Sequence, residues 1–341
     1  MRTAVVGVGR WGVNHVRVLT QLRDEGLIIG GETIDEVFVV DKDRGRAKEV
    51  AERFRADSYS YDLGDLKDVD AFIIAVPTAF HYEVAIKALE KGDVFVEKPL
   101  AASIEEGEEI VSLSKKLGRI LCVGHIERFN PVISALMKEL GSKRDDIIYI
   151  LGERVGPGPP SSPSNLGVAH DLLIHDVDIC LFLLNEVPES VKAIAYRMET
   201  YPYEVDITAV YRFPRGIIAN LRASWRTNPK LKKRFLEVQT EDKIFTVDYI
   251  SMVLQVEEGL REHKYCEHFL DTYAAYVSKK RTIHGVFSKY IEPLRLELID
   301  FLESVCRRKK PLVSGEEGLL ALKCVIKALE SAEKEEAVRI S

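Results

Sequence analysis

Two short segments of the sequence carry side chains suited to acid–base chemistry on a hydroxyl group. Lys98 follows an apolar run and precedes Pro99, and Asp171 and His175 stand four residues apart. An α-helix would place Asp171 and His175 on one face. Histidine has an ordinary pKa of about 6.5, so His175 can accept a hydroxyl proton, while Lys98 can stabilise charge on the oxygen. These residue types predict the oxidation of a secondary alcohol, with Asp171 as the positioning group and either Lys98 or His175 taking the proton.

A glycine-rich turn near the N-terminus predicts a site for a dinucleotide. Gly7-Val8-Gly9-Arg10-Trp11-Gly12 follows a strand-like run and opens a helical pattern. In this context Gly7 permits a tight turn, Gly9 lets a diphosphate approach the backbone, and Gly12 lets the helix pack closely. Free N–H groups and the positive end of the helix dipole would bind the diphosphate.

The residue after the second apolar run selects between the two nicotinamide dinucleotides. Asp41 would accept hydrogen bonds from ribose hydroxyls and repel a 2′-phosphate, which favours NAD over NADP. Asp41 lies further from Gly12 than the usual spacing of about 20 residues, so Arg23–Asp35 is expected to form a longer connection. Arg44 and Arg46 are near enough in sequence to bind a 2′-phosphate, which keeps NADP as the second choice.

The first 124 residues alternate between short apolar runs and amphipathic helical patterns. Nearly continuous apolar runs are typical of parallel strands buried on both faces, and their alternation with helices predicts a doubly wound α/β sheet. Ligands bind beyond the carboxyl ends of such strands, where Lys98 would stand. The expected strands are Thr3–Val6, Val37–Val40, Ala71–Val76, Val94–Val96 and Ile120–Val123, and the expected helices are Arg44–Phe54, Tyr82–Lys91 and Ile104–Leu117.

Residues 125–341 are expected to form a second, α+β domain with an open-faced, mainly antiparallel sheet. The stretch 156–163, rich in proline and glycine, predicts an irregular loop. Apolar residues alternate with polar ones over 205–213 and 217–225, which indicates strands with one covered and one open face. Helices are expected at Val168–Leu184, Pro293–Cys306 and Glu316–Ala332.

The open face of the second domain is expected to form a contact between copies of the chain. We assign Tyr211, Phe235 and Phe245 to that face. An exposed apolar surface of this kind marks a protein–protein contact. The sequence therefore predicts a homotetramer or a homodimer.

Three motifs in this order resemble the glucose–fructose oxidoreductase / inositol dehydrogenase / MocA family along essentially the whole chain. They are the glycine-rich turn, Glu97-Lys98-Pro99 and the pair Asp171-x-x-x-His175. The resemblance implies a Rossmann domain followed by an open-faced sheet, with the matching lysine and histidine beside the reacting carbon. The cofactor contacts that it implies, together with the turn, are Gly7, Gly9, Arg10, Trp11, Gly12, Asp41, Pro77, Thr78, His81, Glu97 and Lys98.

The segment around 124–131 resembles family members that act on nucleotide-linked amino sugars. These members oxidise C3 of a UDP-N-acetylglucosamine-type sugar, and an aminotransferase can then act on the 3-keto product. Besides Lys98, Asp171 and His175, the expected substrate contacts are His125, Arg128 and Arg154, because guanidinium groups suit phosphate oxygens. Two alternatives stay open: a dehydrogenase for a free polyol such as an inositol, and a regulator that binds the dinucleotide without turnover.

Composition excludes several other classes of protein. The 341 residues are 46% hydrophobic and 30% charged, which is enough apolar material for two globular domains. Asp and Glu exceed Lys and Arg by 54 to 48, so the net charge of −6 argues against nucleic acid and anionic membranes. The basic stretch 230–234 is therefore interpreted as a solvated hairpin.

The remaining sequence features favour a cytoplasmic protein without a metal centre. No apolar run approaches the ~20 residues of a membrane span. No His-x-His or His-Glu-x-x-His motif is present, and no Cys-x-x-Cys pair suggests a metal or redox site. The five cysteines are widely spaced, which is typical of reduced thiols: Cys122, Cys180, Cys266, Cys306 and Cys324.

Overall fold

The computed structural model describes residues 1–158, 166–258, 280–286 and 291–340. Within this part of the chain the residues form two compact units, which we describe separately. Unit 1 contains residues 1–126, 166 and 292–326. Unit 2 contains residues 127–158, 167–258, 280–286, 291 and 327–340.

Unit 1 is built on a six-stranded parallel sheet in the order β3-β2-β1-β4-β5-β6. This order confirms the doubly wound sheet. The chain adds β2 and β3 on one side of β1 and then adds β4, β5 and β6 on the other side. The short strand β3 was not predicted, since its three residues are polar and largely exposed. The strands are β1 (Arg2–Val6), β2 (Glu36–Val40), β3 (Ser58–Ser60), β4 (Ala71–Ile74), β5 (Asp93–Glu97) and β6 (Leu121–Gly124).

Side-chain caps set the start of two predicted helices of unit 1. Asp43 accepts a hydrogen bond from the backbone N–H of Arg46 at 3.1 Å, and Ser103 accepts one from that of Glu106 at 3.2 Å. Both helices therefore begin and end where the sequence predicted. The helices are α1 (Gly12–Asp24), α2 (Arg44–Phe54), α3 (His81–Leu89), α4 (Ile104–Leu117) and, from much later in the chain, α8 (Pro293–Arg307).

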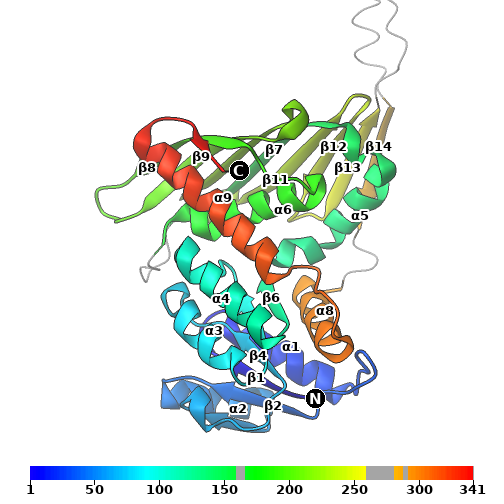
Figure 1. Ribbon diagram of the computed structural model, residues 1–341. Helices are drawn as coiled ribbons and strands as arrows, with labels where there is room; N and C mark the ends of the chain where they lie inside the picture. Colours follow the sequence, from blue (N-terminus) through cyan, green and yellow to red (C-terminus); the bar gives the residue numbers. More distant parts are fainter. Residues whose placement is uncertain (159–165, 259–279, 287–290, 341) are drawn as a thin grey trace, which may run out of the picture. The chain divides into compact units, whose positions relative to one another are not determined.

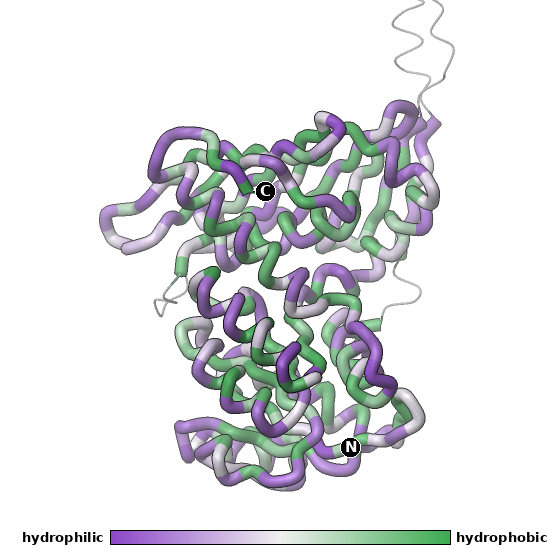
Figure 2. The backbone as a smooth tube through the Cα atoms, viewed as in Figure 1, coloured by the Kyte–Doolittle hydropathy of each residue, from purple (hydrophilic) through white to green (hydrophobic). Residues whose placement is uncertain are grey.

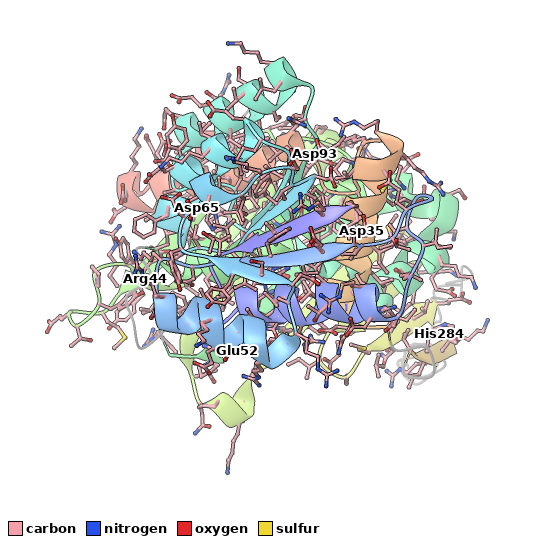
Figure 3. All side chains as sticks on the ribbon, turned by 90° about the horizontal axis from the view of Figure 1, so that it is seen from below. Asp35, Arg44, Glu52, Asp65, Asp93 and His284 are labelled. Carbon is pink, nitrogen blue, oxygen red and sulfur yellow. The ribbon has the colours of Figure 1, made fainter. Side chains whose placement is uncertain are left out.

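The late helix α8 packs into the same hydrophobic core as the first strands. Leu298 and Phe301 are fully buried there with Val5 and Phe95. In Figure 3, which views this unit from below, the labelled Asp35 and Asp93 lie toward one end of the sheet. The labelled Arg44 lies toward the other end, which is the carboxyl end of β2. The carboxyl ends of the parallel strands thus share one edge, as ligand binding in such sheets requires.

Unit 2 is built on a nine-stranded sheet in the order β14-β13-β12-β11-β7-β10-β9-β8-β15. The described pairings are antiparallel except for β7 with β10, so the predicted mainly antiparallel sheet is confirmed. The strands are β7 (Ile147–Pro157), β8 (Ser190–Arg197), β9 (Glu204–Arg212), β10 (Ile218–Thr227), β11 (Lys233–Thr240), β12 (Lys243–Asp248), β13 (Val253–Glu258), β14 (Lys280–Gly285) and β15 (Val338–Arg339).

Helices cover one face of this sheet. Figure 1 shows α5 (Pro131–Leu140) over β12 and β13, and α6 (Ile174–Leu184) beside it. The last helix, α9 (Gly315–Lys334), contributes residues to both units. Short helical turns also occur at Leu63–Asp65, Thr78–Phe80, Ile126–Phe129, Gly141–Asp146, Pro214–Gly216 and Pro229–Leu231.

The two faces of the nine-stranded sheet separate apolar from mixed side chains. Hydrophobic and hydrophilic residues alternate along its strands (Figure 2). Our assignment of Tyr211 and Phe245 to the open face was wrong, because both are buried on the covered face. The alternation had placed Tyr211 in register with Val205 and Ile207, and that pattern is the correct guide. Of the three aromatic residues, only Phe235 lies on the open face, opposite Glu153 and Asp248 of the neighbouring strands.

The open face carries other apolar side chains. Ile194 is 75% exposed and Ile283 is 62% exposed. They lie on β8 and β14, near opposite edges of the sheet. Between them, Arg222 forms ion pairs with Glu153 and Asp206. No helix among the described residues is both long and apolar enough to cross a membrane.

Candidate active site

The glycine-rich turn of unit 1 has open space beside Gly9 and none beside Gly7 and Gly12. Gly7 has a φ of +86°, which suits glycine alone, and a Cβ there would lie 2.7 Å from Val76. A Cβ on Gly12 would lie 1.9 Å from the carbonyl oxygen of Gly7. A Cβ on Gly9 would meet no atom within 4 Å. The turn therefore packs tightly at Gly7 and Gly12 and keeps its backbone accessible at Gly9.

A cavity of about 600 Å³ opens beside this turn at the carboxyl ends of β1, β2 and β4. Five of the expected cofactor contacts line it: Gly7, Gly9, Arg10, Asp41 and Pro77. The cavity also includes side chains that sequence reasoning did not assign, among them Lys42, Phe80 and Lys87. Lys42 lies over the ring of Phe80, at 4.9 Å from its centroid. The lining thus combines backbone amides, cations and an aromatic surface, all of which suit a dinucleotide.

Asp41 is held at the end of β2 by two backbone amides. Its Oδ2 accepts a hydrogen bond from the N–H of Val8, and its Oδ1 accepts one from the N–H of Asp43, both at 2.9 Å. Arg46 approaches Asp41 at 3.5 Å and Asp43 at 3.2 Å. Arg46 lines the cavity as expected of a 2′-phosphate ligand, but in this structure the acidic pair engages its guanidinium group.

Two of the expected cofactor residues lie inside the protein. His81 is buried, with its ring nitrogens 2.8 Å from the carbonyl oxygen of Pro99 and 2.9 Å from that of Val76. Burial lowers the pKa of His81, although both carbonyl groups favour the charged ring. Glu97 is also buried, and its carboxylate accepts hydrogen bonds from Trp11 and His15. Both residues connect segments of unit 1 around the lysine turn.

Three further expected residues of unit 1 lie after its strands or at the start of a helical turn. Lys98 follows β5 directly, its backbone N–H donates to Glu97 at 3.2 Å, and it forms a cis peptide bond with Pro99. Thr78 begins the helical turn before α3. His125 is completely buried just after β6.

Asp171 and His175 of unit 2 lie on different kinds of helix. Asp171 falls in a π-helical turn, Ala169–Leu173, and His175 is in the first turn of α6. The expected single α-helix over Val168–Leu184 was therefore wrong in its first turn. The wider π-turn changes the angle between successive side chains, and such turns occur frequently at functional sites. His175 is 8% exposed, and Asp171 accepts a hydrogen bond from the indole N–H of Trp225 at 3.3 Å.

A buried carboxylate holds the start of this helical segment. Glu204 accepts a hydrogen bond from the N–H of Ala169 at 3.0 Å, and burial raises the pKa of Glu204. A Cβ on Gly167 would lie 2.1 Å from the Glu204 carboxylate, so only glycine fits there. Sequence reasoning missed Glu204 because it is 35 residues from its partner, although Gly167 before the helix was a visible signal.

The two arginines expected to bind substrate are paired with carboxylates inside unit 2. Arg128 donates to Asp178 through Nε and Nη2, at 2.9 and 2.7 Å. Arg154 donates to Glu127 at 2.6 Å and to Asp176 at 2.8 Å. All five residues are at most 5% exposed. The structure therefore places both guanidinium groups in internal ion pairs.

The Arg154 cluster shifts the titration of its members in opposite directions. Burial would raise the pKa of Glu127, but Arg154 and Arg234 lower it overall. Burial raises the pKa of Asp176, and the attraction of Arg154 offsets this only in part. Burial alone would lower the pKa of Arg154, and its two carboxylate partners raise it well above the ordinary value. Arg154 and Glu127 thus favour each other's charged forms, whereas burial acts against the charged form of Asp176.

Comparison with known proteins places both units in a family. Residues 1–125 match the family model of an oxidoreductase family with an NAD-binding Rossmann fold. Residues 164–340 match the model of the C-terminal alpha/beta domain of the same oxidoreductase family. Together the two matches cover most of the chain.

Named relatives include enzymes that act on two kinds of substrate. The chain is 30% identical to UDP-N-acetylglucosamine 3-dehydrogenase of Acidithiobacillus ferrooxidans over 75% of this chain and 76% of that one. A solved structure of that enzyme aligns over 98% of both chains, with 25% identity and a TM-score of 0.82. The chain is 29% identical to scyllo-inositol 2-dehydrogenase (NAD(+)) of Bacillus subtilis over 97% of this chain and 94% of that one.

Proposed function

Because this chain belongs to the oxidoreductase family with an NAD-binding Rossmann fold and is an NAD-dependent dehydrogenase, we propose that it oxidises a hydroxyl group of a nucleotide sugar. The proposed substrate is a UDP-N-acetylglucosamine-type sugar, and the proposed reaction converts its C3 hydroxyl to a ketone. The observation that carries this proposal is the likeness to UDP-N-acetylglucosamine 3-dehydrogenase, which extends over 98% of both chains in three dimensions.

The cavity of unit 1 has the features needed for NAD. Gly9 leaves open space beside the backbone, so a diphosphate can approach the N–H groups at the start of α1. Asp41 stands at the edge of the cavity with two of its hydrogen bonds already fixed, ready to accept ribose hydroxyls. NAD, when bound, supplies a nicotinamide ring that accepts a hydride from the substrate carbon.

The proposed chemical roles belong to three side chains. His175 would accept the proton of the reacting hydroxyl, since imidazole titrates near neutral pH. Lys98 would stabilise the negative charge that develops on the same oxygen and can take the proton in its place. Asp171, held by the indole of Trp225, would orient the sugar or His175.

Of the remaining expected substrate contacts, we keep His125 and assign Arg128 and Arg154 an indirect role. His125 stays a candidate contact at the end of β6. Arg128 and Arg154 would support substrate binding indirectly, because their guanidinium groups hold Asp178, Asp176 and Glu127 in place.

A free inositol is the second candidate substrate. The observation that favours it is the match to scyllo-inositol 2-dehydrogenase over 97% of this chain at 29% identity. The two proposals predict the same cofactor and the same proton transfer. They differ only in what the protein recognises beyond the reacting hydroxyl.

The experiment that separates them follows NADH absorbance with UDP-N-acetylglucosamine and with scyllo- and myo-inositol. We expect turnover with the nucleotide sugar and a product that has lost two hydrogen atoms by mass spectrometry. Turnover with an inositol alone would transfer the proposal to the second candidate. Bound NAD that no sugar reduces would instead indicate a regulator without turnover.

Two variants test the assigned roles. Lys98→Ala and His175→Ala should each lower turnover by about 10²–10⁴-fold, the usual contribution of a positioned acid or base, while NADH still binds. Lys48→Ala and His284→Ala are matched controls, because Lys48 pairs with Glu52 at exposed positions and His284 pairs with Glu139 at partly exposed ones. Near-normal turnover in the first two variants would refute the assignment.

We also propose that the open face of the nine-stranded sheet joins copies of the chain. Ile194, Ile218 and Ile283 expose apolar surface on that face, which favours a contact with a similar surface. Size-exclusion chromatography with light scattering should show a dimer or tetramer, and Ile194→Lys should weaken it. A monomeric wild-type chain would contradict this proposal.

A further inference from the structure

The carboxylate of Glu97 connects three segments of unit 1. Its Oε1 accepts a hydrogen bond from Nε2 of His15 at 2.7 Å and another from the indole N–H of Trp11. Its Oε2 accepts one from the backbone N–H of Lys98 at 3.2 Å. Glu97 therefore links the glycine-rich turn and the start of α1 to the first residue after β5.

Close packing keeps this carboxylate in one orientation. His15 is fully buried, with its ring 5.5 Å from that of Phe95 in an edge contact. A Cβ on Gly124 would lie 3.2 Å from both Cα and Oε2 of Glu97, so β6 approaches to within van der Waals contact. A buried carboxylate depends on its hydrogen-bond donors, because leaving it without them costs much free energy. Trp11 and His15 thus fix where Glu97 can lie.

The two side chains that donate to Glu97 come from the glycine-rich turn and from the helix that follows it. Trp11 belongs to the turn itself and is 45% exposed, whereas His15 lies about one helical turn further along α1. Trp11 lies between Gly9, which has open space beside its backbone, and Gly12, which packs against the carbonyl oxygen of Gly7. A ligand on the N–H groups of the turn would therefore restrict Trp11, and through it the Glu97 carboxylate.

We propose that Trp11, His15 and Glu97 form a positioning relay through which an occupied glycine-rich turn fixes Lys98. In this relay Glu97 acts through the backbone of Lys98 and makes no contact with the cofactor through its carboxylate. The relay couples the binding of the diphosphate to the readiness of the lysine. The inference rests on the proposed function only for the part that Lys98 plays in catalysis.

The test occupies the turn without covering the lysine. ADP-ribose carries the diphosphate and both adjoining riboses but lacks nicotinamide, so it can bind the turn without a ring to shield Lys98. Lys98 reactivity is measured by limited acylation over a range of pH, with mass spectrometry of the labelled peptide, with and without ADP-ribose. In the wild type, ADP-ribose should change the labelling rate of Lys98 by about fivefold or more, a typical coupling between linked sites.

Three variants interrupt the relay at separate points. Trp11→Phe removes an exposed donor and should leave the fold intact, His15→Phe keeps a buried ring, and Glu97→Gln keeps the shape but not the charge. In each, at ADP-ribose concentrations that calorimetry shows to be saturating for that variant, the labelling of Lys98 should no longer respond to the ligand. Tyr82→Phe is the control, because it removes a side-chain hydrogen bond to Glu109 on the surface of the same unit.

The labelling experiment uses no sugar substrate, so its result does not depend on which sugar the protein oxidises. A response in Trp11→Phe and His15→Phe equal to that of the wild type would overturn the relay, as would a wild type whose Lys98 ignores bound ADP-ribose. Failure to find a sugar substrate would count against the proposed function and leave the coupling measurement valid. Coupled labelling with no turnover on any sugar would support the relay alone.

Discussion

The cavity beside the glycine-rich turn and the arginine cluster of unit 2 use charge in opposite ways. The cavity carries cations on an open surface; Arg46, for example, has a side chain that is 47% exposed. The cluster encloses Arg154, Glu127 and Asp176, each at most 5% exposed. An exposed charge can exchange its present partners for a ligand, whereas a buried one is committed to its partners. The difference separates residues that bind from residues that hold the binding elements in place.

The largest effect should come from breaking the buried cluster. Arg154→Met would leave Glu127 and Asp176 without their main partner, and removing one member of a buried ion pair costs about 3–5 kcal/mol. Urea unfolding should show this loss. Arg46→Met is the comparison variant, because its ion pair with Asp43 is exposed on both sides and such a pair is worth about 0–1 kcal/mol, while Asp41 keeps its two backbone N–H donors. Equal losses of unfolding free energy in the two variants would contradict the difference between the buried cluster and the exposed cavity.

The next effect separates stability from affinity within the turn. Gly12→Ala drives a methyl group into the carbonyl oxygen of Gly7, and overpacking of this kind costs about 1–3 kcal/mol. Gly9→Ala meets no neighbouring atom, so its unfolding free energy should change by less than about 0.5 kcal/mol. Its methyl group nevertheless obstructs the backbone, and NADH should bind about tenfold more weakly by calorimetry, or about 1.4 kcal/mol. Unchanged NADH binding in Gly9→Ala would place the diphosphate elsewhere.

The smallest effect concerns pH and tests the cluster from within. The pKa of Glu127 is lowered in the folded protein, so its stabilising contribution is present above the ordinary pKa and is lost as the pH falls below it. The pKa of Asp176 is raised, so its contribution has the opposite sign and increases as the pH falls through the raised value. Unfolding free energies between pH 3 and pH 7 should therefore depend less on acid in Glu127→Gln and more in Asp176→Asn. The same pH dependence in both variants would contradict these opposite directions.

Local patterns predicted much of the fold because their causes are local. The helix at Ile104–Leu117 was predictable from Ser103 at its start and Gly118 at its end. The doubly wound parallel sheet was predictable from the alternation of apolar runs with helical patterns, whereas the polar strand β3 carried no such signal. The face of Tyr211 was knowable from alternation too, and the error lay in ignoring the register of its own strand.

The partners of charged residues could not be predicted in the same way. Arg128 and Asp178 are 50 residues apart, and Trp11 and Glu97 are 86 apart, so only the folded chain brings each pair together. An arginine in a sequence is equally suited to a phosphate and to a buried carboxylate. The π-turn at Ala169–Leu173 could not be predicted for a related reason. The carboxylate that binds its first N–H group belongs to Glu204, which lies on strand β9.

The edge of the nine-stranded sheet at β8 has a consequence for how the chain behaves at high concentration. The two residues of β15 pair with Ser190 and Val191, at the beginning of β8. Ile194 and Tyr196, further along the same strand, are 75% and 49% exposed. Exposed apolar residues on an edge strand invite pairing with another chain, and charged neighbours such as Lys192 and Arg197 oppose it. Neutralising those two cations would turn a protected edge into a starting point for aggregation.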